Sequence, residues 1–160
     1  MHEGHRDRMR QKFLQDGLDS FESHEALEML LYYAIPRKDT NEIAHRLIQE
    51  FGSLSAVFDA PIDTLMRMGK ISERTAILIK MIPQLSRMYL ENKHKYSNKL
   101  LSDDIIGDLL THKFVGRTNE TVILLLMDGK RKQLFCGVAS EGSLSGAENY
   151  IRRIVELSMR

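Results

Sequence analysis

The stretch Thr121-Val-Ile-Leu-Leu-Leu-Met127 decides the fold class, because it follows a long segment of helical periodicity and has a different pattern. A continuous apolar run with β-branched residues predicts a strand that is buried on both faces. Asp128-Gly129 predicts a hairpin turn directly after it. The return strand is expected from Lys132 to Ser140, with alternate apolar residues on one face. The chain is therefore predicted to have an α+β fold.

The first ninety-five residues are predicted to form helices that end at glycine or proline. Gly17 and Gly52 each follow a helical pattern as its C-terminal stop, and Pro36 ends the helix between them. Ser23 is the expected N-cap of that middle helix. The polar stretch 91–99 is the expected linker. Helices are expected over residues 5–15, 23–34, 40–51, 54–58, 61–67, 72–92, 102–110 and 147–158, and domains over residues 1–95 and 96–160.

The composition is that of a globular protein with no strong overall charge. The 160 residues include 23 Lys or Arg and 22 Asp or Glu, for a net charge of +1. This balance excludes a strongly basic nucleic-acid coat but permits a local basic patch. The single cysteine, Cys136, excludes an internal disulfide framework and fits a reducing compartment. With a polar N-terminus and no apolar run near the roughly 20 residues of a membrane span, we expect a cytoplasmic protein without membrane partners.

Motifs for metal or phosphate binding are missing from the sequence. His2 and His5 stand three residues apart, whereas the zinc motif His-Glu-x-x-His needs a spacing of four to place both histidines on one helical face. No glycine-rich phosphate loop of either common pattern occurs. Cys136 lies in mid-strand and is expected to be a small buried hydrophobic residue. We therefore predict no metal site in this chain.

One region favours contact with nucleic acid. Leu65-Met-Arg-Met-Gly-Lys-Ile-Ser-Glu-Arg-Thr-Ala76 predicts two helices joined by a short turn, the helix-hairpin-helix pattern. In such a hairpin, glycines let the backbone approach a phosphate, and the second helix offers free N–H groups. These contacts do not depend on base sequence. Glu73 would oppose a phosphate at the same helix start. The candidate nucleic-acid-binding residues are Gly69, Lys70, Ser72, Arg74 and Lys80.

The N-terminal half resembles the N-terminal domain of RadC-type proteins. The resemblance covers nearly all of residues 4–93 and is carried by Gly4-His-Arg-Asp-Arg-Met-Arg-Gln-Lys-Phe13 and by residues 17–41. It continues through Ala44-His-Arg-Leu47 and Glu50-Phe-Gly-Ser-Leu54. The family carries a DNA-repair name. The resemblance implies a helical domain of the helix-hairpin-helix type.

Residues 100–160 resemble the start of a JAB/MPN (JAMM) metallopeptidase-like domain, the second domain of that family. Residues 120–128 and 140–144 match its first strands, and residues 152–157 match its first long helix. The resemblance implies a zinc ion in full-length members, held by a His-x-His-Pro pair and an aspartate, with a glutamate as general acid/base. Glu141 is the candidate for that glutamate. His-x-His-Pro does not occur in this sequence, so we expect an incomplete domain without zinc and without peptidase activity of its own.

Three hypotheses follow for the function. The first is a RadC-like member of the metallopeptidase family that is inactive as a peptidase. The second is a non-enzymatic helix-hairpin-helix module that binds DNA through backbone phosphates. Against it stand Lys70 and Ser72 where the family pattern has glycines, and equal numbers of acidic and basic residues (14 each) over residues 1–95. The third is a protein-interaction domain whose exposed sheet edge pairs with a second copy or another protein.

Overall fold

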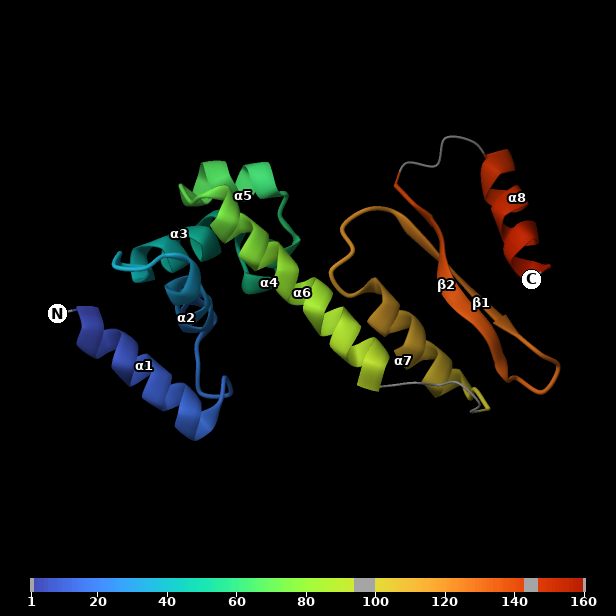
Figure 1. Cartoon of the computed structure of the whole chain (residues 1–160), viewed down its shortest axis with the longest axis horizontal. Helices are drawn as coiled ribbons and strands as arrows, with labels where there is room; N and C mark the ends of the chain where they lie inside the picture. Colours follow the sequence, from blue (N-terminus) through green and yellow to red (C-terminus); the bar gives the residue numbers. More distant parts are fainter. Residues whose placement is uncertain (1, 94–99, 143–146, 160) are drawn as a thin grey trace. The chain divides into compact units, whose positions relative to one another are not determined.

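The computed structural model describes residues 2–93, 100–142 and 147–159 (Figure 1). Within these residues the chain forms eight helices and one two-stranded antiparallel sheet, which confirms the predicted α+β class. The elements are α1 (His2–Asp16), α2 (Ser23–Ala34), α3 (Asn41–Phe51), α4 (Leu54–Asp59), α5 (Ile62–Gly69), α6 (Glu73–Lys93), α7 (Asp103–Phe114), β1 (Thr121–Met127), β2 (Gln133–Glu141) and α8 (Ala147–Ser158). No helix in these ranges is both long and apolar enough to cross a membrane.

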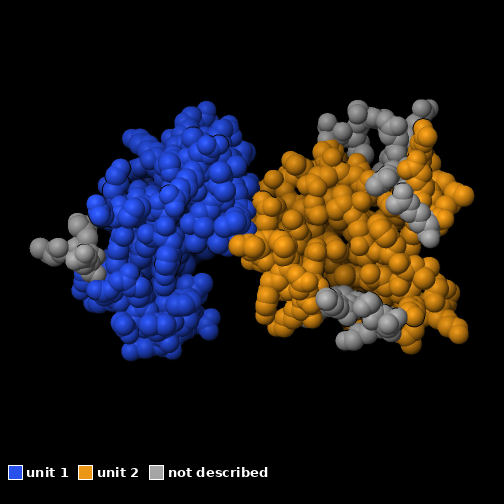
Figure 2. Space-filling model, viewed as in Figure 1, with its two compact units in different colours: residues 1–82 blue, residues 83–160 orange. Residues whose placement is uncertain are grey.

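The chain divides into two compact units, residues 1–82 and 83–160, which Figure 2 distinguishes by colour. The division falls inside α6, so this helix contributes residues to both units. The predicted linker lies largely over residues 94–99, outside the described part of the chain. The domains 1–95 and 96–160 stay a prediction.

The core of the first unit forms where the apolar faces of α2 to α6 meet. α3 shows why, because Ala44 and Leu47 lie on one face and are fully buried while its polar residues face outward. Burying a leucine side chain contributes roughly 1.5–3 kcal/mol, so this core provides most of the stability of the unit. Its buried members are Leu27, Leu31, Ala44, Leu47, Val57, Ala60, Leu65, Ile71, Ala76 and Ile79.

The predicted helix-ending glycines of the first unit are confirmed, and one predicted cap is corrected. Gly17 (φ +66°) and Gly52 (φ +85°) follow α1 and α3 in the left-handed conformation, as expected of C-terminal stops. The N-cap of α2 is Glu22, and the prediction of Ser23 was wrong by one residue. The side chains of Glu22 and Glu25 exchange hydrogen bonds with each other's backbone, so a carboxylate takes the role usually given to a hydroxyl.

The sheet of the second unit is a hairpin. β1 pairs with β2 so that Leu125 faces Cys136 across the strands. The turn is longer than two residues, since β1 ends at Met127 and β2 begins at Gln133. The Asp128 carboxylate accepts hydrogen bonds from the amides of Lys130 and Lys132, and Arg131 adopts a positive φ. Residues of β1 are half-buried or exposed, not buried on both faces as predicted, since β2 is its only neighbouring strand among the described residues.

The loop after α7 packs tightly within the second unit. α7 extends to Phe114, four residues beyond the predicted end. Gly116 follows with φ +70°, and a Cβ there would lie 2.9 Å from Pro83 Cβ and 3.0 Å from the Pro83 carbonyl carbon. Arg87 donates to the Val115 carbonyl at 2.8 Å. These contacts attach the loop to the second half of α6.

Candidate nucleic-acid interface

The predicted hairpin is present and consists of α5, the turn Lys70-Ile-Ser72 and α6. Lys70 is the C-cap of α5 and is left-handed, with φ 52° and ψ 43°. Gly69 is buried beneath it, because a Cβ at Gly69 would lie 2.7 Å from Leu47 Cδ2. The Gly69 carbonyl accepts a hydrogen bond from Arg46 at 3.2 Å. Gly69 therefore allows close packing onto α3, and Lys70 is the residue that makes the turn.

Ser72 caps the start of α6. Its Oγ accepts from the Thr75 amide at 3.3 Å and lies 3.0 Å from Thr75 Oγ1. Thr75 is buried, whereas Ser72 is exposed at the turn. The two hydroxyls therefore form a fixed pair at the N-terminal end of a 21-residue helix.

Lys80 and Arg74 have different surroundings. The Lys80 ammonium donates to the carbonyls of Phe58 (2.8 Å) and Asp59 (3.0 Å) at the end of α4, and burial lowers its pKa. Its charge is thus engaged inside the unit, although a contact with DNA stays a prediction. Arg74 is exposed in the first turn of α6 and borders a shallow hollow with Tyr33 and Ile77.

A second turn, between α2 and α3, carries basic residues that the sequence analysis did not single out. Arg37 adopts φ +64°, and the exposed Lys38 follows it. Arg6 of α1 fixes this turn, because its guanidinium donates to the carbonyls of Ile35 (3.1 Å) and Lys38 (2.5 Å). Two adjacent basic residues between a helix-stopping proline and the next helix were the available signal. Arg6 gave no local signal, since its role depends on the packing of α1.

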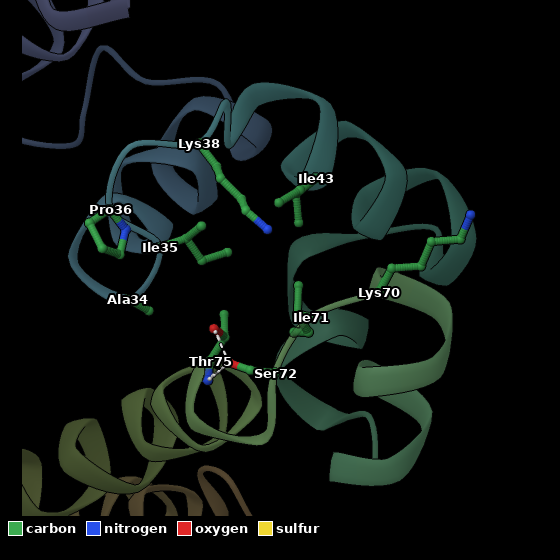
Figure 3. A pocket seen from close by; sticks show the side chains of 9 residues that line it. All are labelled: Ala34, Ile35, Pro36, Lys38, Ile43, Lys70, Ile71, Ser72 and Thr75. Atoms are coloured by element: carbon green, nitrogen blue, oxygen red, sulfur yellow. Dashed lines mark hydrogen bonds between the residues drawn. The ribbon is translucent and has the colours of Figure 1, made fainter.

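The two turns border one cavity of about 220 Å³ (Figure 3). Figure 3 shows the Lys38 side chain directed into the cavity, whereas the Lys70 side chain points away from it. Within the described residues, neither lysine is paired with a carboxylate. The lining residues are Ala34, Ile35, Pro36, Lys38, Ile43, Lys70, Ile71, Ser72 and Thr75. The predicted residues Lys70 and Ser72 are thus brought together with Lys38, which was not predicted.

A buried carboxylate joins the first three helices. Glu28 is 1% exposed, and its oxygens lie 3.0 Å from His5 Nε2, 2.7 Å from the Tyr32 hydroxyl and 2.8 Å from Asn41 Nδ2. Burial, and then the hydrogen bond to Glu28, raises the pKa of Tyr32. Because each partner comes from α1, α2 or α3, the cluster fixes the position of α1, which carries Arg6.

The candidate acid/base residue of the second unit is not in a metal-binding environment. Glu141 lies at the end of β2, and its carboxylate accepts from the Arg117 guanidinium at 2.6 Å. In the part of the chain that the structure describes, no group of three or more His, Cys, Asp and Glu could hold a metal ion. The described residues therefore do not fit the zinc site that the resemblance implies. Cys136 is half-buried, and burial raises the pKa of its thiol.

Comparison with known proteins finds relatives of this chain. The chain is 33% identical over 159 residues to the UPF0758 protein of Fusobacterium nucleatum subsp. nucleatum, and the match covers 95% of this chain and 68% of that protein. No model of a protein family matches the chain. No solved structure matches it either.

Proposed function

Because the chain belongs to the UPF0758 family, which is the RadC family, we propose that its first unit binds the sugar–phosphate backbone of nucleic acid. The contact surface is where the α2–α3 and α5–α6 turns meet. One observation carries the proposal: Arg37, Lys38, Lys70 and Arg74 lie on or beside these turns, and none is paired with a carboxylate in the described residues.

The charge of these side chains is local, because the unit as a whole is not basic. Residues 1–82 contain 11 Lys or Arg and 13 Asp or Glu. Long-range attraction to nucleic acid is therefore small, and binding depends on the four side chains and on the N-terminal end of α6. Glu73 in the first turn of that helix opposes them. We expect weak binding that does not depend on base sequence, with a Kd of about 10⁻⁴ to 10⁻⁶ M.

Fluorescence anisotropy of a labelled duplex at several salt concentrations tests this proposal. Two to four phosphate contacts give a slope of log K against log salt of about −2 to −4. Replacing Lys70 or Arg74 with Gln should weaken binding and make the slope shallower by about one each. Arg10→Gln is the matched control, because it removes the same charge from α1, where Arg10 pairs with Asp7. The proposal is wrong if all three variants bind like the parent chain.

The charge of Glu73 provides a second, opposite test of the same surface. Glu73→Gln removes a carboxylate from the first turn of α6, where phosphate would bind. Its affinity for the duplex should therefore rise, while its stability should change little because the side chain is exposed. An unchanged or lower affinity would place the nucleic acid elsewhere.

We further propose that this chain does not hydrolyse peptide bonds by itself. Two observations support this: His-x-His-Pro does not occur in its sequence, and the Glu141 carboxylate pairs with Arg117. Zinc in longer members of the family stays a prediction. Elemental analysis of the purified chain after dialysis tests the proposal, and stoichiometric zinc would contradict it. Pairing of the β1 edge with a partner also stays a prediction, which light scattering at several concentrations tests.

A further inference from the structure

We propose that the cavity between the two turns binds a terminal phosphate monoester on a sugar, such as the phosphorylated end of a nucleic-acid strand. The inference rests on the proposed function for its biological source, and the cavity shares Lys38 and Lys70 with the proposed contact surface. Lys38 enters the cavity while Lys70 points away (Figure 3). The two lysines therefore serve different contacts, one with a group inside the cavity and one with the backbone outside.

The polar side of the cavity offers hydrogen-bond donors and no carboxylate. Lys38 contributes an ammonium group with three donors. Ser72 and Thr75 share one hydrogen bond between their hydroxyls, whichever of the two donates it. Two hydroxyls carry two protons, so one O–H is left over from this bond and can donate to an anion at this turn. An anion there would receive charge-assisted hydrogen bonds from the ammonium and the remaining hydroxyl.

The apolar side of the cavity selects what the anion is attached to. Ile35, Ile43 and Ile71 also line the cavity and offer no polar atom from their side chains. A sugar ring can place its C–H faces on such side chains while its phosphate reaches the donors. A bare inorganic ion would leave the apolar wall without a partner, so a sugar phosphate fits the lining better.

A terminal monoester fits this donor set better than an internal diester. It has three terminal oxygens and a second negative charge near neutral pH, since its second pKa is about 6. An internal diester presents only two free oxygens and a single negative charge, so it offers fewer acceptors to the ammonium and the hydroxyl. Arg6 donates hydrogen bonds to the carbonyls of Ile35 and Lys38, on either side of Pro36-Arg37. These bonds fix the backbone of Lys38 before the ligand binds.

The experiment compares two duplexes of one sequence, one phosphorylated at all four termini and one with hydroxyl termini. The full chain should bind the phosphorylated duplex about tenfold more tightly, the change expected from charge-assisted hydrogen bonds. Lys38→Met keeps the apolar stem and should abolish this preference, while it weakens binding of the hydroxyl duplex no more than Lys70→Met does. Lys70→Met is the matched variant, and it should weaken both duplexes equally and keep the preference. Equal binding of both duplexes by the parent chain overturns the inference and leaves the proposed function standing.

A titration with free deoxyribose 5-phosphate separates the two possible sources of the ligand. If the cavity takes a sugar phosphate, the Ser72 and Thr75 amide signals should shift in nuclear magnetic resonance spectra of the parent chain but not of Lys38→Met. Such shifts in a chain that binds neither duplex would support the cavity as a site for a free sugar phosphate and refute the proposed function. No shift together with no preference for phosphorylated ends would refute the cavity as a site.

Discussion

The variant Lys70→Gly separates two properties of Lys70: the strain of its backbone conformation and the contribution of its charge to binding. Lys70 lies at φ 52° and ψ 43°, in the left-handed region. This conformation costs an L-residue roughly 1–2 kcal/mol, and glycine does not pay that cost. Glycine also loses more backbone freedom on folding than other residues, and this opposes the gain by about 0.5–1 kcal/mol. The variant should therefore unfold with a free energy about 0.5–1 kcal/mol above that of the parent, although it has lost an ammonium group from the proposed interface.

Urea unfolding followed by far-ultraviolet circular dichroism measures this difference. Lys70→Ala is the control, since it removes the same charge but keeps a Cβ at a positive φ, and it should not be stabilised. Both variants should lose the same factor in duplex affinity because both lose the ammonium. If Lys70→Gly is less stable than Lys70→Ala, the turn is not strained in the way inferred here. If only Lys70→Gly loses affinity, turn rigidity and not charge determines binding.

Three other residues give predictions of stability and reactivity. Gly116→Ala should destabilise the chain by about 2 kcal/mol or more, because its methyl group meets the backbone of α6 at a positive φ; Gly107→Ala, which has open space in α7, should not, and thermal unfolding of both compares them. The hydrogen bond from Lys12 is the main cause that holds the pKa of Glu25 below its ordinary value of 4.5. The pair therefore stabilises the folded chain at pH values above the unfolded-state pKa of Glu25. This stabilisation is lost as the pH falls through the lower, folded-state pKa. Glu25→Gln should therefore be less stable than the parent near neutral pH and equal to it in acid, and a difference in stability that is the same at both would contradict this. Cys136, whose thiol pKa is raised by burial, should react with a disulfide reagent far more slowly in the native chain than in urea.

The features of the fold that depend on residues close together in the sequence were predictable. Gly17 and Gly52 end helices because only a residue that tolerates a positive φ can reverse the chain there. The position of the α2 cap was not, because Glu22 and Ser23 are adjacent candidates and the choice depends on the reach of Glu25. The burial of β1 was overestimated, since a run of apolar residues does not reveal how many strands lie beside it.

The candidate site divides in the same way. The two helices and the short turn of the hairpin follow from a local pattern, and the structure contains them. The packing of Gly69 against Leu47 and the engagement of Lys80 by the end of α4 depend on helices far away in sequence, so no local pattern predicts them. The cavity itself was beyond prediction, because Lys38 and Ser72 are brought together only by the packing of the two helix pairs.

The identity of the strained residues argues for binding over a purely structural role of the turns. In the described part of the first unit, the non-glycine residues with positive φ are Arg37 and Lys70, one in each turn beside the cavity. Glycine at either position would relieve a cost of roughly 1 kcal/mol, so turn geometry alone does not account for a long cationic side chain there. Strained backbone conformations of this kind are common at ligand sites. There the strained residue positions a side chain that contacts the ligand and not another part of the chain. Under the proposed function, phosphate is the partner that these two cations would hold.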